Sequence, residues 1–129
     1  MSHLLAHRHF IFRAVGAVAL GAEDVEKVNQ WVLDLVRKID MEILIPPQTV
    51  YCDLEGNEGI TSVCVISTSH VALHAWESSK EIQLDVYSCK PFPIETVASH
   101  IEELVGKYTK SDFLCLNRDR VIDVQHDCL

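Results

Sequence analysis

Hydrophobic and polar positions alternate most regularly between residues 61 and 89. Residues 62–66 are mostly apolar and β-branched. After a short break, residues 70–76 alternate strictly, which places Val71, Leu73 and Ala75 on one face of a strand and His70, Ala72, His74 and Trp76 on the other. A polar turn at residues 77–80 leads to a second alternating run at residues 82–89, where one face carries Gln83, Asp85, Tyr87 and Cys89. This pattern predicts a β-hairpin with one apolar face and one face of reactive side chains.

Two amphipathic helices are predicted on either side of this region. Residues 21–40 carry apolar side chains at i, i+3, i+4 and i+7, and residues 93–107 do the same after a proline in the first turn. Further extended segments are predicted at residues 3–15, 41–45, 48–54 and 113–116, with a loop at 53–59. The order β-α-β-β-β-α-β favours an α/β (α+β) two-layer sandwich, in which a mainly antiparallel sheet carries both helices on one face.

The length of 129 residues is that of one domain, and we expect residues 1–129 to form a single unit with a polar, peripheral tail at 117–129. A content of 48% hydrophobic and 23% charged residues is typical of globular proteins. The net charge of −8 disfavours binding to nucleic acid or to an anionic membrane surface, since both require a basic face.

Neither a membrane span nor a signal peptide is expected from the sequence. No apolar run approaches the roughly 20 residues that span a bilayer, and the first ten residues do not have the basic-then-apolar pattern of a signal peptide. The five cysteines are odd in number and have no CxxC spacing. These features predict reduced thiols and a cytoplasmic location.

The reactive face of the hairpin is open to four interpretations. It could be a dimer surface or a satisfied part of the core, since buried histidine and cysteine are common. Hydrolysis by Ser69 or Cys89 with a histidine as base lacks the GxSxG elbow. A metal site made by His70, His74 and Cys89 is disfavoured, because residues i and i+4 of a strand lie about 13 Å apart. In the fourth interpretation, the Ser69 hydroxyl attacks the preceding backbone carbonyl at a strained break between strands.

The fourth interpretation agrees with a family resemblance. Ser69-His70-x-x-x-His74-x-Trp76, followed by LDVYSC at residues 84–89, resembles the bacterial and archaeal class of the S-adenosylmethionine decarboxylase family. The serine-to-histidine spacing of five and the serine-to-cysteine spacing of twenty are those of the family. The run GITSVCVIS before the serine and the opening HLLA also match, so that the resemblance covers roughly residues 3–107. Members of this family cleave themselves and use a pyruvoyl group.

The resemblance implies a self-cleavage between Thr68 and Ser69. Ser69 Oγ would attack the Thr68 carbonyl and form an ester, and β-elimination assisted by His74 would release the chain that ends at Thr68. The dehydroalanine left at position 69 would hydrolyse to a pyruvoyl group, which forms a Schiff base with the substrate amine and acts as the electron sink for loss of CO₂. Cys89 would return a proton to the substrate Cα. Thr61 aligns with a hydroxyl residue of the family's active site.

The resemblance also implies partners and cofactors. The pyruvoyl group derived from Ser69 would be the cofactor, with no metal, and the enzyme would be a homodimer of cleaved protomers with active sites near the interface. Its small-molecule substrate would be S-adenosylmethionine, decarboxylated for polyamine (spermidine) biosynthesis. Trp76 could stack on the adenine or close the core, and Tyr51 is a second candidate for stacking. Glu77 is the candidate for binding the ribose.

Three positions differ from the family pattern. The residue before the cleaved serine is usually Glu but is Thr68 here, and the Pro-Glu that usually follows the tryptophan is replaced by Glu77-Ser78. Glu77 therefore comes one position early and would point to the other face of its strand. Two alternatives follow: a pyruvoyl enzyme of the same family that decarboxylates ornithine or arginine, or an uncleaved, non-catalytic homologue that binds or regulates a partner subunit.

Overall fold

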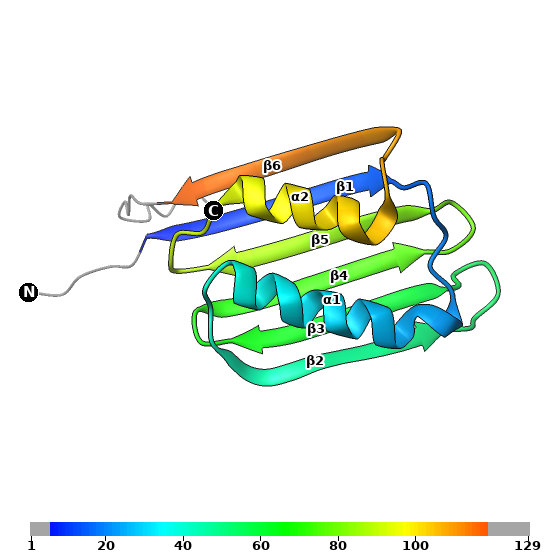
Figure 1. The fold of residues 1–129 in the computed structure, drawn as a ribbon, viewed down its shortest axis with the longest axis horizontal. Helices are drawn as coiled ribbons and strands as arrows, with labels where there is room; N and C mark the ends of the chain where they lie inside the picture. The colour runs from blue at the N-terminus through cyan, green and yellow to red at the C-terminus, as the bar shows by residue number, and fades with distance from the viewer. Residues whose placement is uncertain (1–5, 119–129) are drawn as a thin grey trace, which may run out of the picture.

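The computed structural model describes residues 6–118 as six strands, two α-helices and a 3₁₀ turn (Figure 1). In chain order the elements are β1 (His7–Val15), the 3₁₀ turn η1 (Ala22–Asp24), α1 (Val25–Lys38), β2 (Ile43–Cys52), β3 (Gly59–Ile66), β4 (Ser69–Trp76), β5 (Glu81–Ser88), α2 (Ile94–Val105) and β6 (Lys110–Arg118). No helix in this part of the chain is long and apolar enough to cross a membrane.

The strands form one sheet in the order β2-β3-β4-β5-β1-β6, and all neighbouring strands are antiparallel. Both helices cover the same face of this sheet (Figure 1). The two-layer sandwich predicted from the sequence is therefore confirmed. Four strands, β2, β3, β4 and β5, separate the two helices, whereas the predicted order has three.

The largest differences from prediction lie at the two edges of the sheet. The segments predicted on either side of Pro46-Pro47 form one strand, β2, whose pairing with β3 shifts register between Ile43 and Gln48. An edge strand accommodates proline because only one side of it has to pair. At the other edge, β6 is longer than the predicted segment 113–116 and pairs with β1 along its whole length.

Other boundaries move by a few residues. The first strand begins at His7, and residues 3–5 of its predicted range lie outside the described part of the chain. The first helix begins at Val25 after the 3₁₀ turn rather than at Gly21. The predicted tail at 117–129 loses its first two residues to β6, and its remainder lies outside the described residues.

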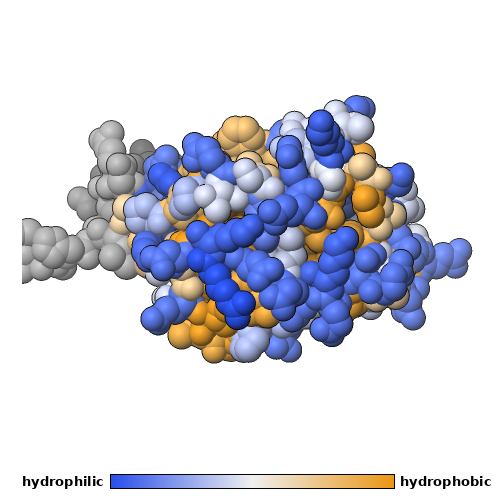
Figure 2. All heavy atoms as spheres, in the orientation of Figure 1, coloured by the Kyte–Doolittle hydropathy of each residue, from blue (hydrophilic) through white to orange (hydrophobic). Residues whose placement is uncertain are grey.

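The strict alternation in the sequence becomes a division between two faces of the sheet. Side chains on the helix side form the core, among them Phe10, Leu73, Leu84 of the sheet and Trp31 and Ile101 of the helices. Trp31 is buried as part of this core, and its indole N–H donates a 2.7 Å hydrogen bond to the His100 carbonyl. Polar side chains cover most of the outer surface on the helix side (Figure 2).

The other face of the sheet, which we call the open face, is covered by no helix of residues 6–118 (Figure 1). It presents the odd-numbered residues of β1, β3 and β5 and the even-numbered residues of β4 and β6. All members of the predicted reactive face except Cys89, which follows β5, lie within these strands. The open face is the surface on which the candidate chemistry is arranged.

Gly59 marks a point where β3 and β4 approach closely. A Cβ at this position would lie 1.9 Å from the Ala75 carbonyl oxygen, which belongs to the backbone and cannot move aside. We expect Gly59→Ala to lower the free energy of unfolding by about 3 kcal/mol, at the upper end of the cost of overpacking. Urea unfolding measures this loss.

Gly56→Ala is the matched control. Gly56 has a φ of +82° but no atom within 4 Å of the added Cβ, so that only the left-handed backbone is penalised, at about 1 kcal/mol. Equal losses of stability in the two variants would contradict the close approach at Gly59.

Candidate functional site

The predicted cleavage junction lies in the tight turn between β3 and β4. Ile66 pairs with Ser69, so that Ser67 and Thr68 alone form the turn. Ser69 has a φ of +156°, which is unusual for a residue other than glycine. Such backbone conformations cost on the order of 1–3 kcal/mol and persist where surrounding contacts hold them. The bond before Ser69 is therefore held in a strained segment between two regular strands.

The Thr68 carbonyl is hydrogen-bonded at the same point. The backbone N–H of Cys89 donates to this oxygen at 3.1 Å, just beyond the pair that Ser69 makes with Ser88 in the β4–β5 ladder. An N–H in this place polarises the carbonyl and would stabilise negative charge on its oxygen. Three predicted site residues, Thr68, Ser69 and Cys89, are thus brought together, and we call them the Ser69 cluster.

A second group of predicted site residues lies at the opposite end of β4. Thr61 Oγ1 and His74 Nδ1 are 3.1 Å apart, and the rings of His74 and Trp76 have centroids 6.2 Å apart. All three residues line a shallow cavity of about 120 Å³, together with Cys52, Asn57, Gly59, Ile60 and Ala75. We call Thr61, His74 and Trp76 the His74 cluster.

Within one chain the two clusters do not meet. Ser69 and His74 are five residues apart on β4, and at the rise of a strand this separates them by about 16 Å. His74 of a single protomer is therefore not placed to act on Ser69.

Glu77, the candidate for the ribose, lies on the helix side of the sheet. Its carboxylate accepts a hydrogen bond from Tyr51 Oη and lies beside Gly21, just before the first helix. This hydrogen bond, assisted by burial and by nearby carboxylates, raises the pKa of Tyr51 to about 12. The structure thus joins Tyr51 and Glu77 to each other and does not bring Glu77 to the His74 cluster.

The middle of the open face holds a polar network that sequence reasoning missed. His9 Nε2 and His70 Nε2 lie 2.6 Å and 3.6 Å from the same Asp85 carboxylate oxygen. His7 is hydrogen-bonded to the hydroxyl of Tyr87, and the Tyr87 ring stacks on His70 at 5.8 Å. Within residues 6–118, no group of three His, Cys, Asp or Glu side chains is placed to hold a metal ion. The registers of β5 against β1 and β4 bring these residues together.

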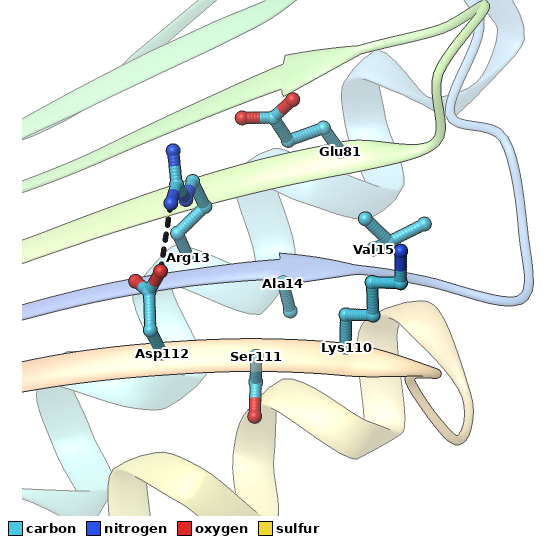
Figure 3. A pocket seen from close by; sticks show the side chains of 7 residues that line it. All are labelled: Arg13, Ala14, Val15, Glu81, Lys110, Ser111 and Asp112. Atoms are coloured by element: carbon cyan, nitrogen blue, oxygen red, sulfur yellow. Dashed lines mark hydrogen bonds and ion pairs between the residues drawn. The ribbon is translucent and has the colours of Figure 1, made fainter.

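A larger groove, of about 250 Å³, lies away from both clusters (Figure 3). It is lined by Arg13, Glu81, Lys110 and Asp112 with Ala14, Val15 and Ser111, and none of these was predicted as a site residue. Arg13 donates a 2.7 Å hydrogen bond to Asp112, and this ion pair raises the pKa of the guanidinium. The groove is thus partly closed by its own paired charges.

Comparison with known proteins decides the family. A family model described as S-adenosylmethionine decarboxylase matches residues 8–113. The chain belongs to the S-adenosylmethionine decarboxylase family. Two proteins named S-adenosylmethionine decarboxylase proenzyme illustrate its distance from other members of the family. The one from Pyrococcus abyssi is 26% identical over 102 residues, which are 78% of this chain and 70% of the relative. The one from Geobacillus kaustophilus is 25% identical over 118 residues, which are 92% of each chain.

The fold is also that of a solved family structure. The crystal structure of the adenosylmethionine decarboxylase from Aquifex aeolicus matches with a TM-score of 0.66 at 17% identity, over 95% of this chain and 98% of the other. The family expected from the spacing of serine, histidine and cysteine is therefore confirmed, and so is the architecture. The roles of the individual residues remain predictions.

The Tyr51–Glu77 hydrogen bond predicts a late tyrosine titration. The neutral phenol is the stabilised form, so that the contribution of this contact is fully present below the unfolded pKa of about 10 and is lost as the pH rises through about 12. We expect Glu77→Gln to lower the pKa of Tyr51, because the hydrogen bond to the Glu77 carboxylate is the largest cause of the raised pKa. The absorbance of the phenolate measures this titration.

Tyr51→Phe assigns the late transition, since it should remove that transition from the titration curve. Tyr108→Phe is the control and should leave it in place. If Tyr51 of the wild type ionised with the ordinary tyrosine pKa of about 10, the hydrogen bond to Glu77 would be contradicted.

Proposed function

We propose that this chain is a proenzyme that cleaves itself between Thr68 and Ser69 and then decarboxylates S-adenosylmethionine to supply polyamine (spermidine) synthesis. The observation that carries the proposal is the Cys89 N–H on the Thr68 carbonyl, directly beside the positive φ of Ser69. Membership of the family gives the reaction, and this geometry supports the first step of maturation.

The first step is an N→O acyl shift. Ser69 Oγ attacks the Thr68 carbonyl carbon, the bond from that carbon to the Ser69 nitrogen breaks, and the hydroxyl proton passes to the released amine. The product is an ester between Thr68 and the Ser69 side chain. The Cys89 N–H, already bonded to the carbonyl oxygen, would stabilise the charge that develops there. Relief of the strained φ at Ser69 favours the shift.

The second step needs a base. Removal of the Ser69 Cα proton breaks the Cβ–Oγ bond, and Thr68 leaves as a carboxylate. The dehydroalanine at position 69 takes up water and loses ammonia to give the pyruvoyl group. His74 is the base implied by the family pattern, and Thr61 Oγ1 lies 3.1 Å from its Nδ1, where it can orient the ring. Since His74 lies about 16 Å along the strand from Ser69 of its own chain, we infer that it acts on Ser69 of a second copy.

The open face supports such a homodimer. It exposes apolar side chains on several strands, with Val50 61%, Val63 40% and Leu114 54% exposed. Two copies could stack their open faces about a two-fold axis that lies between the sheets and perpendicular to the strands. The strands of one copy would then run opposite to the equivalent strands of the other. The Ser69 cluster of each copy would then face the His74 cluster of the other, so that both active sites are completed at the interface.

The residues at the junction fit a pyruvoyl group. The pyruvoyl group supplies a ketone that takes up the electron pair released with CO₂. Cys89, half-buried beside position 69, would return a proton to the substrate Cα. Trp76 offers an aromatic face for the adenine. Glu77 suits the ribose less well, because Tyr51 holds its carboxylate on the helix side.

Self-cleavage is tested by the intact mass of the denatured protein. We expect two fragments divided between Thr68 and Ser69, the second reduced by the conversion of serine to pyruvoyl. Ser69→Ala should remain whole. Cys89→Ala keeps its backbone N–H, and we expect it to cleave but to release CO₂ more slowly. An uncut wild type after long incubation would contradict the proposal and favour the binding homologue. A CO₂ assay with S-adenosylmethionine, ornithine and arginine separates the two enzymatic alternatives.

The exchange of His74 between copies is tested by complementation. Ser69→Ala and His74→Ala chains should each remain uncut alone. Co-expressed with distinguishable tags, they should form a mixed dimer in which the Ser69→Ala chain supplies His74 and the His74→Ala chain is cleaved. Intact mass identifies the cleaved chain. Continued absence of cleavage in an isolated mixed dimer would contradict action between copies.

A further inference from the structure

Ser88 is a fully buried polar residue at the cleavage junction to which the steps above give no role. It is the last residue of β5, is 0% exposed and lies opposite Ser69 in the ladder. Its hydroxyl donates a 2.9 Å hydrogen bond to Thr68 Oγ1 and accepts one of 2.9 Å from the Lys90 N–H. The hydroxyl of Ser88 thus acts both as a hydrogen-bond donor and as an acceptor within the protein.

The Thr68 side chain continues this chain of hydrogen bonds. Thr68 Oγ1 accepts a hydrogen bond from Ser88 and donates one of 3.1 Å to Met41 Sδ. Because Met41 is buried in the core, the contact ties the turn to the helix side of the sheet. Thr68 is thus held through its side chain as well as through its carbonyl, by two consecutive residues, Ser88 and Cys89.

Because the hydroxyl and the carbonyl of Thr68 are both held, the face of the carbonyl carbon that is presented to Ser69 is fixed. Attack requires the hydroxyl oxygen to lie about 3–3.5 Å from the carbonyl carbon in an aligned approach, and a displacement of 1 Å can cost about 100-fold in rate. A turn of two residues whose next residue has a φ of +156° keeps this geometry only while neighbouring contacts constrain it. The hydrogen bond from Ser88 is such a contact.

We propose that Ser88 is a positioning residue for self-cleavage, acting through the Thr68 hydroxyl to orient the carbonyl that Ser69 attacks. This inference rests on the self-cleavage proposed above and concerns its first step. Ser88 exchanges no proton with the reacting atoms. Its loss would therefore slow formation of the ester and leave the later elimination unchanged.

Ser88→Ala and Ser62→Ala form a matched pair for the test. Ser62 is likewise 0% exposed, on the helix side of β3, which β4 separates from β5. Its hydroxyl is 2.8 Å from that of a threonine, Thr49, far from the junction. Each chain is made by cell-free synthesis, and the fraction cleaved is followed over time by intact mass. We expect Ser88→Ala to slow cleavage about ten-fold or more, and Ser62→Ala to cleave at the wild-type rate.

Substitutions at Thr68 test the pathway from Ser88. Thr68→Val keeps the shape without the hydroxyl and should slow cleavage as Ser88→Ala does, whereas Thr68→Ser keeps the hydroxyl and should restore the rate. In the Thr68→Val background, Ser88→Ala should have no further effect, because the interaction is already lost. Independent, additive effects would contradict action through Thr68.

Hydroxylamine distinguishes positioning from loss of the base, because it cleaves esters. His74→Ala should accumulate the ester and be cut by hydroxylamine, whereas Ser88→Ala should accumulate little ester and resist it. If the wild type cleaves and Ser88→Ala cleaves at the same rate, the role of Ser88 is overturned but self-cleavage is not. An uncut wild type in the same assay would overturn self-cleavage, and the role of Ser88 with it.

Discussion

The register of the ladder between β4 and β5 is the constraint on which the candidate site depends. Pairing of Ser69 with Ser88 places the next N–H, that of Cys89, on the Thr68 carbonyl and directs the Ser88 hydroxyl into the core beside Thr68. A slip of one residue would turn Ser88 to the open face and remove both contacts, because side chains alternate with a period of two. The same rigid ladder keeps His74 at the far end of β4. One strand therefore both builds the cleavage junction and holds its expected base away from it.

The sequence predicts the central strands and the helices well, because their burial is one-sided. Val71, Leu73 and Ala75 are buried while the residues between them are not, so that alternation identifies the strand and its two faces. The edges of the sheet are harder. Pro46-Pro47 suggests an interruption, yet β2 passes through them because its outer side pairs with nothing in the described part of the chain. Strand β6 has large apolar side chains exposed on both faces, so that no alternation marks its ends.

The candidate site is predictable from the sequence only as a set of residue types at fixed spacing. Ser69, His74 and Cys89 identify the family, but spacing along the chain does not show that the Cys89 N–H meets the Thr68 carbonyl. This contact follows from strand direction and register. The contacts of Asp85 with His9 and of Tyr51 with Glu77 join residues separated by 76 and 26 positions, and no local pattern indicates either pair. No sequence signal marks Ser88, because a serine on the buried face of a strand resembles an ordinary core position.

The polar network of the open face bears on whether a second copy can cover it. Burying a polar group is costly when its partners are lost. Here His9 is already paired with Asp85, and His7 with Tyr87, within one chain. A covering sheet would therefore have to satisfy few new polar groups, whereas exposed residues such as Val63 and Leu114 would gain apolar contact. On the proposed mechanism, association of two such faces is what brings a base to Ser69. The junction could then form early and remain uncut until the chains pair, which would couple maturation to assembly.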